Sequence, residues 1–279
     1  MRFGISFATS GPYSDPRLLA DLAREAEDAQ WDGCFLWDHI QVRPPETMAD
    51  PWVALTAIVL ATSRIRVGTL VTPLYRRYPW ELARATVTLD HLSEGRLVLG
   101  VGLGSDLFGE ISTFSGPLDD RVRAQMLDEG LAVLTGLWSG ESFSFTGVHF
   151  QVSSTRFVPV PLQSPRIPIW VAGTWPRRPP FRRAARFEGV VPVKGDLQSS
   201  LSAAQVGELV DYVSQYRDSK TVGPFDVVFS AETSESGARA RQIVAQYAAA
   251  GATWWLENMH PWHRTPAQVR DRIRQGPPR

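Results

Sequence analysis

The chain has 279 residues, of which 43% are hydrophobic and 21% charged, and its 29 basic side chains balance 29 acidic ones. This is the composition of an ordinary globular protein, and the lack of excess positive charge argues against sequence-independent binding to nucleic acid. One cysteine, no apolar run of about 18 residues and no cleavable signal pattern at the N-terminus lead us to expect a cytoplasmic protein without a membrane span.

Strand-like and helical runs alternate along the whole chain, with apolar residues at helical spacing in the helical runs. The predicted strands are 2–7, 33–39, 65–73, 96–104, 167–175, 189–195, 225–232 and 253–261. The predicted helices are 16–30, 51–62, 79–93, 118–138, 180–188, 202–217, 236–251 and 266–275. Alternating aromatics around 146–147 interrupt this rhythm and predict a β-hairpin.

Eight strand–helix units imply parallel strands, because parallel neighbours need a crossover connection. We therefore predict a single α/β domain over 1–279, a (β/α)8 TIM barrel with a β-hairpin insertion at about 139–166 after the fourth βα unit. An open doubly wound sheet is the main competing fold.

Polar and glycine residues collect where the predicted strands end, and in such a barrel this edge carries the active site. The strand-end residues singled out here are Asp38, His39, Thr72, Gly102, Gly104, Ser105, Ala172, Gly173, Thr174, Trp175, Lys194 and Glu257. The pair Asp38-His39 is either a satisfied structural pair or the edge of a site, since burying both groups is costly unless each finds a partner.

Other motifs in the chain are less informative. The run "GVGLGS" (100–105) lies in the fourth unit and lacks the spacing of a dinucleotide fingerprint. "WVAGTW" (170–175) fits a phosphate-binding strand end or a tight turn about equally. The histidines show no metal-ligand spacing and no G-x-S-x-G elbow is present, so we expect neither a metal site nor a serine hydrolase.

The stretch 50–104, which contains "SRIRVGTLVTPLYRRYPW" and "EGRLVLGVGLG", resembles the luciferase-like monooxygenase family. The resemblance continues through 116–150 and 165–192 and implies the same barrel, a bound flavin-type cofactor and a homodimer. It also implies a cis peptide bond at Leu70-Val71 against the cofactor ring, with Thr72, Gly102, Gly104 and Ser105 nearby. Ala172, Gly173 and Thr174 would approach the cofactor phosphate.

The resemblance further places His39 beside the reactive face of the ring, where it would orient substrate or move a proton while Asp38 holds its surroundings. Glu257 is added as an acid or base on its strand-end position alone. Trp37, Trp175 and Lys194 suggest an aromatic substrate pocket with one cation.

Two cofactors fit this family, FMN and the deazaflavin F420. In bacterial luciferase an arginine between the two strand-four glycines binds the FMN phosphate, whereas this chain has Leu103. We therefore favour F420-dependent hydride transfer to or from a small organic substrate. The alternatives are an FMNH2-dependent monooxygenase, a non-catalytic flavin-binding protein, and a metal-dependent hydrolase that uses Asp38 and His39 as ligands.

Overall fold

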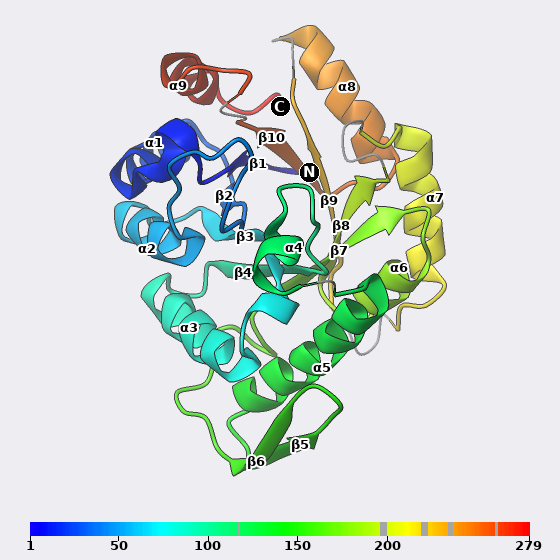
Figure 1. The fold of residues 1–279 in the computed structure, drawn as a ribbon. Coiled ribbons are helices and arrows are strands. Elements are labelled where there is room, and N and C mark those ends of the chain that lie inside the picture. The colour runs from blue at the N-terminus through cyan, green and yellow to red at the C-terminus, as the bar shows by residue number, and fades with distance from the viewer. Residues whose placement is uncertain (117, 196–199, 219–222, 234–236, 260–261) are drawn as a thin grey trace.

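Eight parallel strands close into a barrel in the order β1-β10-β9-β8-β7-β4-β3-β2 (Figure 1). The computed structural model describes residues 1–116, 118–195, 200–218, 223–233, 237–259 and 262–279. The barrel strands are β1 (Arg2–Phe7), β2 (Gly33–Leu36), β3 (Arg66–Pro73), β4 (Leu97–Gly102), β7 (Ile169–Trp175), β8 (Gly189–Lys194), β9 (Asp226–Ala231) and β10 (Trp254–Asn258). The closed barrel confirms the predicted fold class and excludes the open sheet.

Helices surround the barrel, and each predicted helical run contains one. They are α1 (Pro16–Asp28), α2 (Pro51–Ala61), α3 (Pro79–Leu92), α5 (Asp120–Trp138), α6 (Pro179–Ala184), α7 (Ala203–Ser214), α8 (Ala238–Ala249) and α9 (Pro266–Arg274). A short helix that the sequence analysis did not predict, α4 (Glu110–Phe114), follows β4, and the 3-10 turns η1 (Gly11–Ser14) and η2 (Leu74–Arg76) follow β1 and β3. Residues 236 and 260–261 of the predicted runs lie outside the described residues.

The helix starts follow from local chemistry. Proline is among the first helical residues of α1, α2 and α9, where its missing N–H costs no hydrogen bond. The preceding Asp15, Asp50 and Thr265 side chains accept backbone N–H groups as N-caps.

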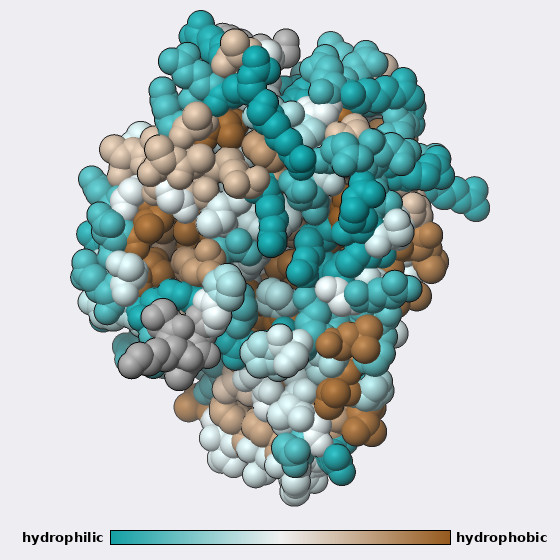
Figure 2. Space-filling view, turned by 180° about the vertical axis from the view of Figure 1, so that it is seen from behind, coloured by the Kyte–Doolittle hydropathy of each residue, from teal (hydrophilic) through white to brown (hydrophobic). Residues whose placement is uncertain are grey.

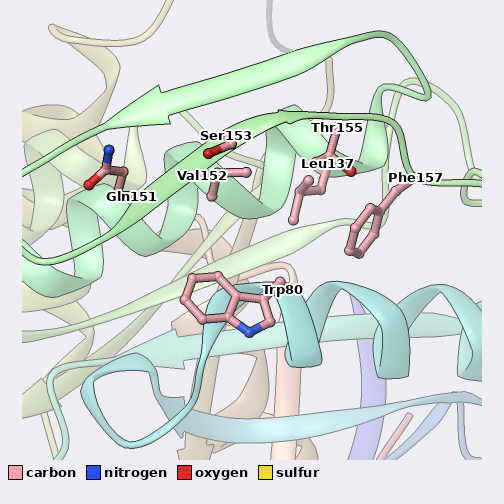
Figure 3. Close-up of a pocket in the computed structure, with 7 residues that line it drawn as sticks. All are labelled: Trp80, Leu137, Gln151, Val152, Ser153, Thr155 and Phe157. Atoms are coloured by element: carbon pink, nitrogen blue, oxygen red, sulfur yellow. The ribbon is translucent and has the colours of Figure 1, made fainter.

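The predicted insertion is a hairpin of β5 (Phe143–Thr146) and β6 (Gln151–Thr155), which are antiparallel. The carboxylate of Glu129 on α5 accepts the N–H groups of Val148, His149 and Phe150 at 2.8, 2.9 and 3.0 Å, and so ties the hairpin turn to the barrel. A cavity of about 360 Å³ lies beneath the hairpin, and Trp80 faces Val152 and Phe157 across it (Figure 3). These residues belong to the outer layer, away from the strand ends.

Side chains alternate between the inside and the outside of the barrel along each strand. The interior is filled by Phe35, Val98, Trp170, Val191, Val228, Trp254 and Leu256. Phe35, Trp170 and Trp254 contact one another with ring centroids 5.2 to 5.7 Å apart. Gly189 makes room for them, since a Cβ there would lie 2.4 Å from Trp170. The barrel is therefore a packed core beneath its carboxyl-end rim.

The outer surface is mixed. The face opposite to that of Figure 1 carries hydrophilic side chains between hydrophobic areas on both flanks, one of them at the edge where α2 lies (Figure 2). On α2, Val53 and Leu60 are 64% and 71% exposed. Within the described part of the chain, no helix combines the length and the apolar character that a membrane crossing requires.

Candidate active site at the carboxyl ends of the strands

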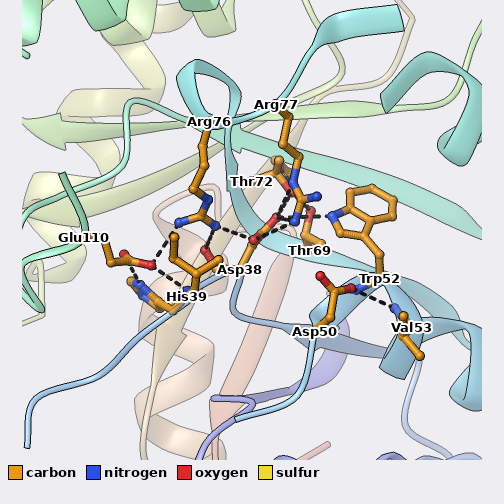
Figure 4. A network of polar contacts seen from close by, with 12 residues as sticks. Asp38, His39, Asp50, Trp52, Val53, Thr69, Thr72, Arg76, Arg77 and Glu110 are labelled. Carbon is orange, nitrogen blue, oxygen red and sulfur yellow. Dashed lines mark hydrogen bonds and ion pairs between the residues drawn. The ribbon is translucent and has the colours of Figure 1, made fainter. Parts of the chain in front are cut away.

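Asp38 and His39 point to different sides of the barrel wall (Figure 4). Asp38 is buried and its carboxylate contacts Arg76 at 2.5 Å, Arg77 at 3.1 Å and the Thr72 hydroxyl at 2.8 Å. The Trp52 indole N–H on α2 also donates to it at 3.2 Å. With its oxygens fully engaged, Asp38 anchors the helical layer, which fits the holding role expected for it.

The ionisation of Asp38 follows from this environment. Burial opposes the charged form, but the guanidiniums of Arg77 and Arg76 outweigh it and hold the pKa of the Asp38 carboxyl below its usual value. The carboxylate is therefore charged at neutral pH and unsuited to exchanging protons.

His39 faces the barrel mouth and is held by Glu110 rather than by Asp38. Its Nδ1 lies 2.7 Å from Glu110 Oε2, while Glu110 Oε1 accepts the Ile40 N–H at 2.6 Å and Arg76 at 2.9 Å. Burial opposes ionisation of Glu110, but its bonds to His39, Ile40 and Arg76 bring the pKa of its carboxyl below the usual value. An ionised Glu110 accepts a hydrogen bond from Nδ1–H, so in the neutral imidazole the free lone pair lies on Nε2.

Glu110 is the main site residue that the sequence analysis missed. It is the first residue of α4, a five-residue helix that Asp106 begins by accepting the Ile111 N–H at 2.8 Å. Arg76 joins the two carboxylates, since its guanidinium contacts both Asp38 and Glu110. A helix this short leaves no periodic signal, so nothing in the pattern distinguished Glu110 from a solvated loop residue.

The end of β3 is irregular at the position that the family resemblance implied. The Leu70-Val71 peptide bond is cis, and the β3–β4 register shifts between Thr69 and Thr72. Both Leu70 and Val71 pack against the interior cluster, whereas neighbours in a regular strand face opposite sides. Thr72 turns outward, because its hydroxyl bonds Asp38 and Thr69.

The ends of β4 and β7 present small residues to the interior. A Cβ on Gly102 would lie 2.7 Å from Val71 and 3.4 Å from Ala172, so these three residues form one continuous apolar surface. Gly104 has φ +72°, a left-handed conformation that favours glycine. Gly173 packs against Pro180 of α6, where a Cβ would lie 2.5 Å away, and this contact explains its small size.

Two residues expected in the substrate pocket lie elsewhere. Trp175 is 3% exposed and packs outside the barrel against Phe181 and Tyr212, at centroid distances of 5.2 and 6.3 Å. Lys194 pairs with Trp175 in the parallel β7–β8 register, which places its side chain on the same outer face. Neither is retained in the proposed pocket. Trp37 does lie at the mouth, and its indole donates to Ser6 Oγ at 3.1 Å.

The side chain of Glu257 faces away from the barrel interior. Trp254 and Leu256 point inward, so Glu257 points outward, where it is fully buried and bonded to Thr233 at 2.8 Å. Arg272 of α9 lies 3.4 Å from it. We therefore do not retain Glu257 as an acid or base.

The next residue of β10, Asn258, is the one directed inward by the alternation. Its Oδ1 accepts the Ser230 hydroxyl at 2.6 Å, and it pairs in register with Ser6 of β1. The Ser6, Ser230 and Asn258 side chains thus line the mouth on the β1–β10–β9 side.

The one cysteine of the chain, Cys34, is buried in β2. Burial raises the pKa of the Cys34 thiol to about 12, so it stays protonated and inert. In the part of the chain that the structure describes, no three His, Cys, Asp or Glu side chains are grouped as metal ligands.

The fold and this rim define an α/β barrel whose candidate active site combines an oriented histidine with a flat apolar interior surface. The chain belongs to the luciferase-like monooxygenase family, whose model matches residues 1–276.

Curated relatives include an F420-dependent glucose-6-phosphate dehydrogenase of Microbacterium testaceum, 31% identical over 203 residues, or 70% of this chain and 57% of that protein. An F420-dependent hydroxymycolic acid dehydrogenase of Mycobacterium tuberculosis is 35% identical over 164 residues, or 58% of this chain and 44% of that protein. The chain thus spans roughly half the length of these curated relatives.

Solved structures share the fold at low identity. An F420-dependent secondary alcohol dehydrogenase in complex with an F420-acetone adduct superposes with a TM-score of 0.77 at 15% identity, covering 98% of this chain and 97% of that one. A monooxygenase from Streptomyces bottropensis gives a TM-score of 0.76 at 21% identity, covering 99% and 97%. These similarities concern the fold.

Proposed function

We propose that the chain is an oxidoreductase that uses a flavin-type cofactor and favours F420-dependent hydride transfer to or from a small organic substrate. Membership of the luciferase-like family supports the cofactor class, and relatives described as F420-dependent support the choice of deazaflavin. The observation that carries the proposal is His39 at the barrel mouth, bonded through Nδ1 to the buried, ionised Glu110.

The residues of the rim fit a planar ring cofactor. Val71, Gly102 and Ala172 offer an apolar surface without a long side chain. Ser105 and Thr174, at the ends of β4 and β7, supply hydroxyls for the polar part of the molecule. When bound, the deazaflavin supplies a ring carbon that accepts or donates a hydride.

His39 performs the proton half of the reaction. In the oxidation of an alcohol, Nε2 takes the hydroxyl proton as the C–H hydride leaves and the C=O bond forms; in the reverse direction it returns that proton. The Nδ1–H bond to Glu110 fixes the tautomer and the ring plane, and stabilises the imidazolium when it forms.

The end of β4 favours F420 over FMN. Leu103 supplies no charge or donor, and the cation that reaches this turn, Arg123, donates to the carbonyl oxygens of Leu103 and Gly104 at 2.9 and 2.8 Å. It also donates to the Leu118 carbonyl at 3.2 Å and to Asp120 at 2.5 Å. Arg123 is therefore engaged in holding the turn rather than placed to receive a phosphate.

The assigned role of His39 can be tested by kinetics. The first step is an anaerobic screen of alcohols and ketones with F420; His39→Ala is then compared with His149→Ala, which removes a histidine from the hairpin. General acid–base catalysis contributes about 10²–10⁴-fold, so His39→Ala should lose turnover to that extent and keep its cofactor affinity. Full turnover in His39→Ala would refute the assignment, and FMN-dependent oxygen consumption would favour the monooxygenase.

We also propose that two copies of this cytoplasmic protein form a homodimer through α2. This helix is apolar on every side, and its outward residues Val53 and Leu60 are largely exposed. Light scattering should give a dimer for the wild type and a monomer for Leu60→Glu; a monomeric wild type would refute the proposal.

A further inference from the structure

Four aromatic rings, that of His39 among them, form a closed circuit at the barrel mouth. The ring centroids of Trp37 and His39 are 5.9 Å apart, and those of His39 and Phe108 are 5.1 Å apart. Phe108 and Trp37 each lie 6.2 Å from Trp262. These residues follow β2, β4 and β10, so three separate strand ends contribute to the circuit.

The circuit is solvent-accessible and its orientation is fixed. Trp262 is 46% exposed, which is high for so large an apolar side chain. The indole N–H groups point to fixed acceptors, Trp37 to Ser6 Oγ and Trp262 to Glu46 Oε1, both at 3.1 Å. The polar atom of each indole is thus bonded within the protein, and the exposed part of Trp262 is largely apolar ring.

The rim continues this apolar character next to the circuit. Ile40, beside His39, is 41% exposed, and Leu107, beside Phe108, is 63% exposed. An exposed apolar patch of this kind is typical of a ligand-binding surface.

Three arginines around this rim are engaged with acidic or carbonyl groups of the protein. Arg76 and Arg77 bind Asp38, and Arg264 donates to the Thr233 carbonyl at 3.1 Å and lies 3.6 Å from Glu257. Arg43 donates to the Thr113 hydroxyl at 2.9 Å.

Lys194, the last residue of β8, does not face the circuit. Its register with Trp175 places its side chain on the outer face of the barrel. A phosphate needs charged donors, and the guanidiniums of Arg76, Arg77 and Arg264 are already engaged within the protein.

Resting on the function proposed above, we infer that the substrate is an alcohol, or the corresponding carbonyl compound, carrying an aromatic or similarly planar group. That group packs on the Trp37–Phe108–Trp262 circuit, and its oxygen lies at His39 Nε2. This substrate class differs from a sugar phosphate, and Phe108 and Trp262 are the residues that determine the difference.

Ligand binding tests this inference independently of turnover. Saturation-transfer NMR would measure the affinity of the F420-loaded chain for 1-phenylethanol, for 1-cyclohexylethanol of the same size, and for glucose 6-phosphate. Well-placed aromatic pairs are worth roughly 2- to 12-fold in affinity. We therefore expect 1-phenylethanol to bind tighter than the cyclohexyl analogue by that factor, and glucose 6-phosphate to bind weakest.

The variants Phe108→Leu and Trp262→Leu should abolish the preference for the aromatic alcohol, while Tyr78→Leu, which removes an exposed ring on the outer layer, should leave it unchanged. Equal binding of the two alcohols, stronger binding of the sugar phosphate, or a preference unaffected by both circuit variants would overturn the inference. Cofactor titration of the same samples separates the two proposals. If the chain binds neither F420 nor FMN, the proposed function is refuted. The relative affinity of the unloaded chain for the two alcohols then still tests whether the circuit binds an aromatic group.

Discussion

Replacing Glu110 by glutamine changes one atom of the carboxylate and should reverse the tautomer of His39. Glu110 Oε1 accepts two donors, the Ile40 N–H at 2.6 Å and Arg76 at 2.9 Å. The oxygen of a glutamine must occupy this position, because an amino group there would face two donors. Its NH2 group then takes the place of Oε2, which lies 2.7 Å from His39 Nδ1.

In Glu110→Gln, the side-chain NH2 would therefore donate to Nδ1, and the ring proton would move to Nε2. The lone pair that we assign to proton transfer would then be lost. General-base catalysis contributes about 10²–10⁴-fold, equivalent to about 2.7–5.4 kcal/mol of barrier. We expect turnover to fall by that factor while cofactor affinity stays within about threefold, because Glu110 acts through His39.

Two measurements check this prediction. Long-range nitrogen–proton NMR of the His39 ring reports the tautomer directly, and stopped-flow kinetics under anaerobic conditions report the rate of cofactor reduction. Glu129→Gln is the matched control, because it alters a carboxylate that binds backbone N–H groups in the hairpin. An unchanged tautomer, or a rate within threefold of the wild type, would show that Glu110 does not set the state of His39.

Three further substitutions test the surroundings of the site. Asp38→Asn removes the buried carboxylate that Arg76 and Arg77 share and should cost about 3–5 kcal/mol in the free energy of unfolding at pH 7. Because the folded pKa of Asp38 is depressed, its stabilisation is present above the unfolded pKa of about 3.9 and is lost as the pH falls through the folded pKa. Denaturation curves should therefore show a smaller difference in the free energy of unfolding between variant and wild type near pH 3 than at pH 7. An equal difference at both pH values would contradict this account. Gly102→Ala places a methyl 2.7 Å from Val71 and should lower stability by about 1–3 kcal/mol and weaken cofactor binding, with unchanged binding arguing against this surface. Asn258→Leu should reduce kcat/KM by roughly 2- to 12-fold, as expected for one hydrogen bond, and leave the affinity for the cofactor unchanged.

The sequence predicted the barrel because the alternation of strands and helices is a periodic signal repeated over the whole chain. The same periodicity could have corrected Glu257. Trp254 and Leu256 are the inward residues of β10, so a residue one position further must face the helices. A position at the end of a strand places a residue at the rim of the barrel. The alternation of side chains along the strand then decides whether that residue faces the interior or the helices.

The side-chain contacts of the site residues were harder to predict than their positions at the strand ends. His39 lies next to Asp38 in the chain, yet its partner is Glu110, 71 residues away on a five-residue helix. Trp175 likewise ends β7 but packs against α6 and α7, because Phe181 and Tyr212 cover the outer face there. Such pairings depend on how separate loops meet, and no local pattern records them.

The central claim is that this barrel binds a flavin-type cofactor at the mouth beside His39. Titration of the chain with F420 and with FMN, each oxidised and reduced, would follow quenching of tryptophan fluorescence, to which Trp37 at the mouth should contribute. We expect saturable binding of F420, tighter than that of FMN, with quenching reduced in Trp37→Phe. Failure of both cofactors to bind would contradict the account. Stronger binding of reduced FMN than of F420 would favour oxygen-dependent chemistry over hydride transfer.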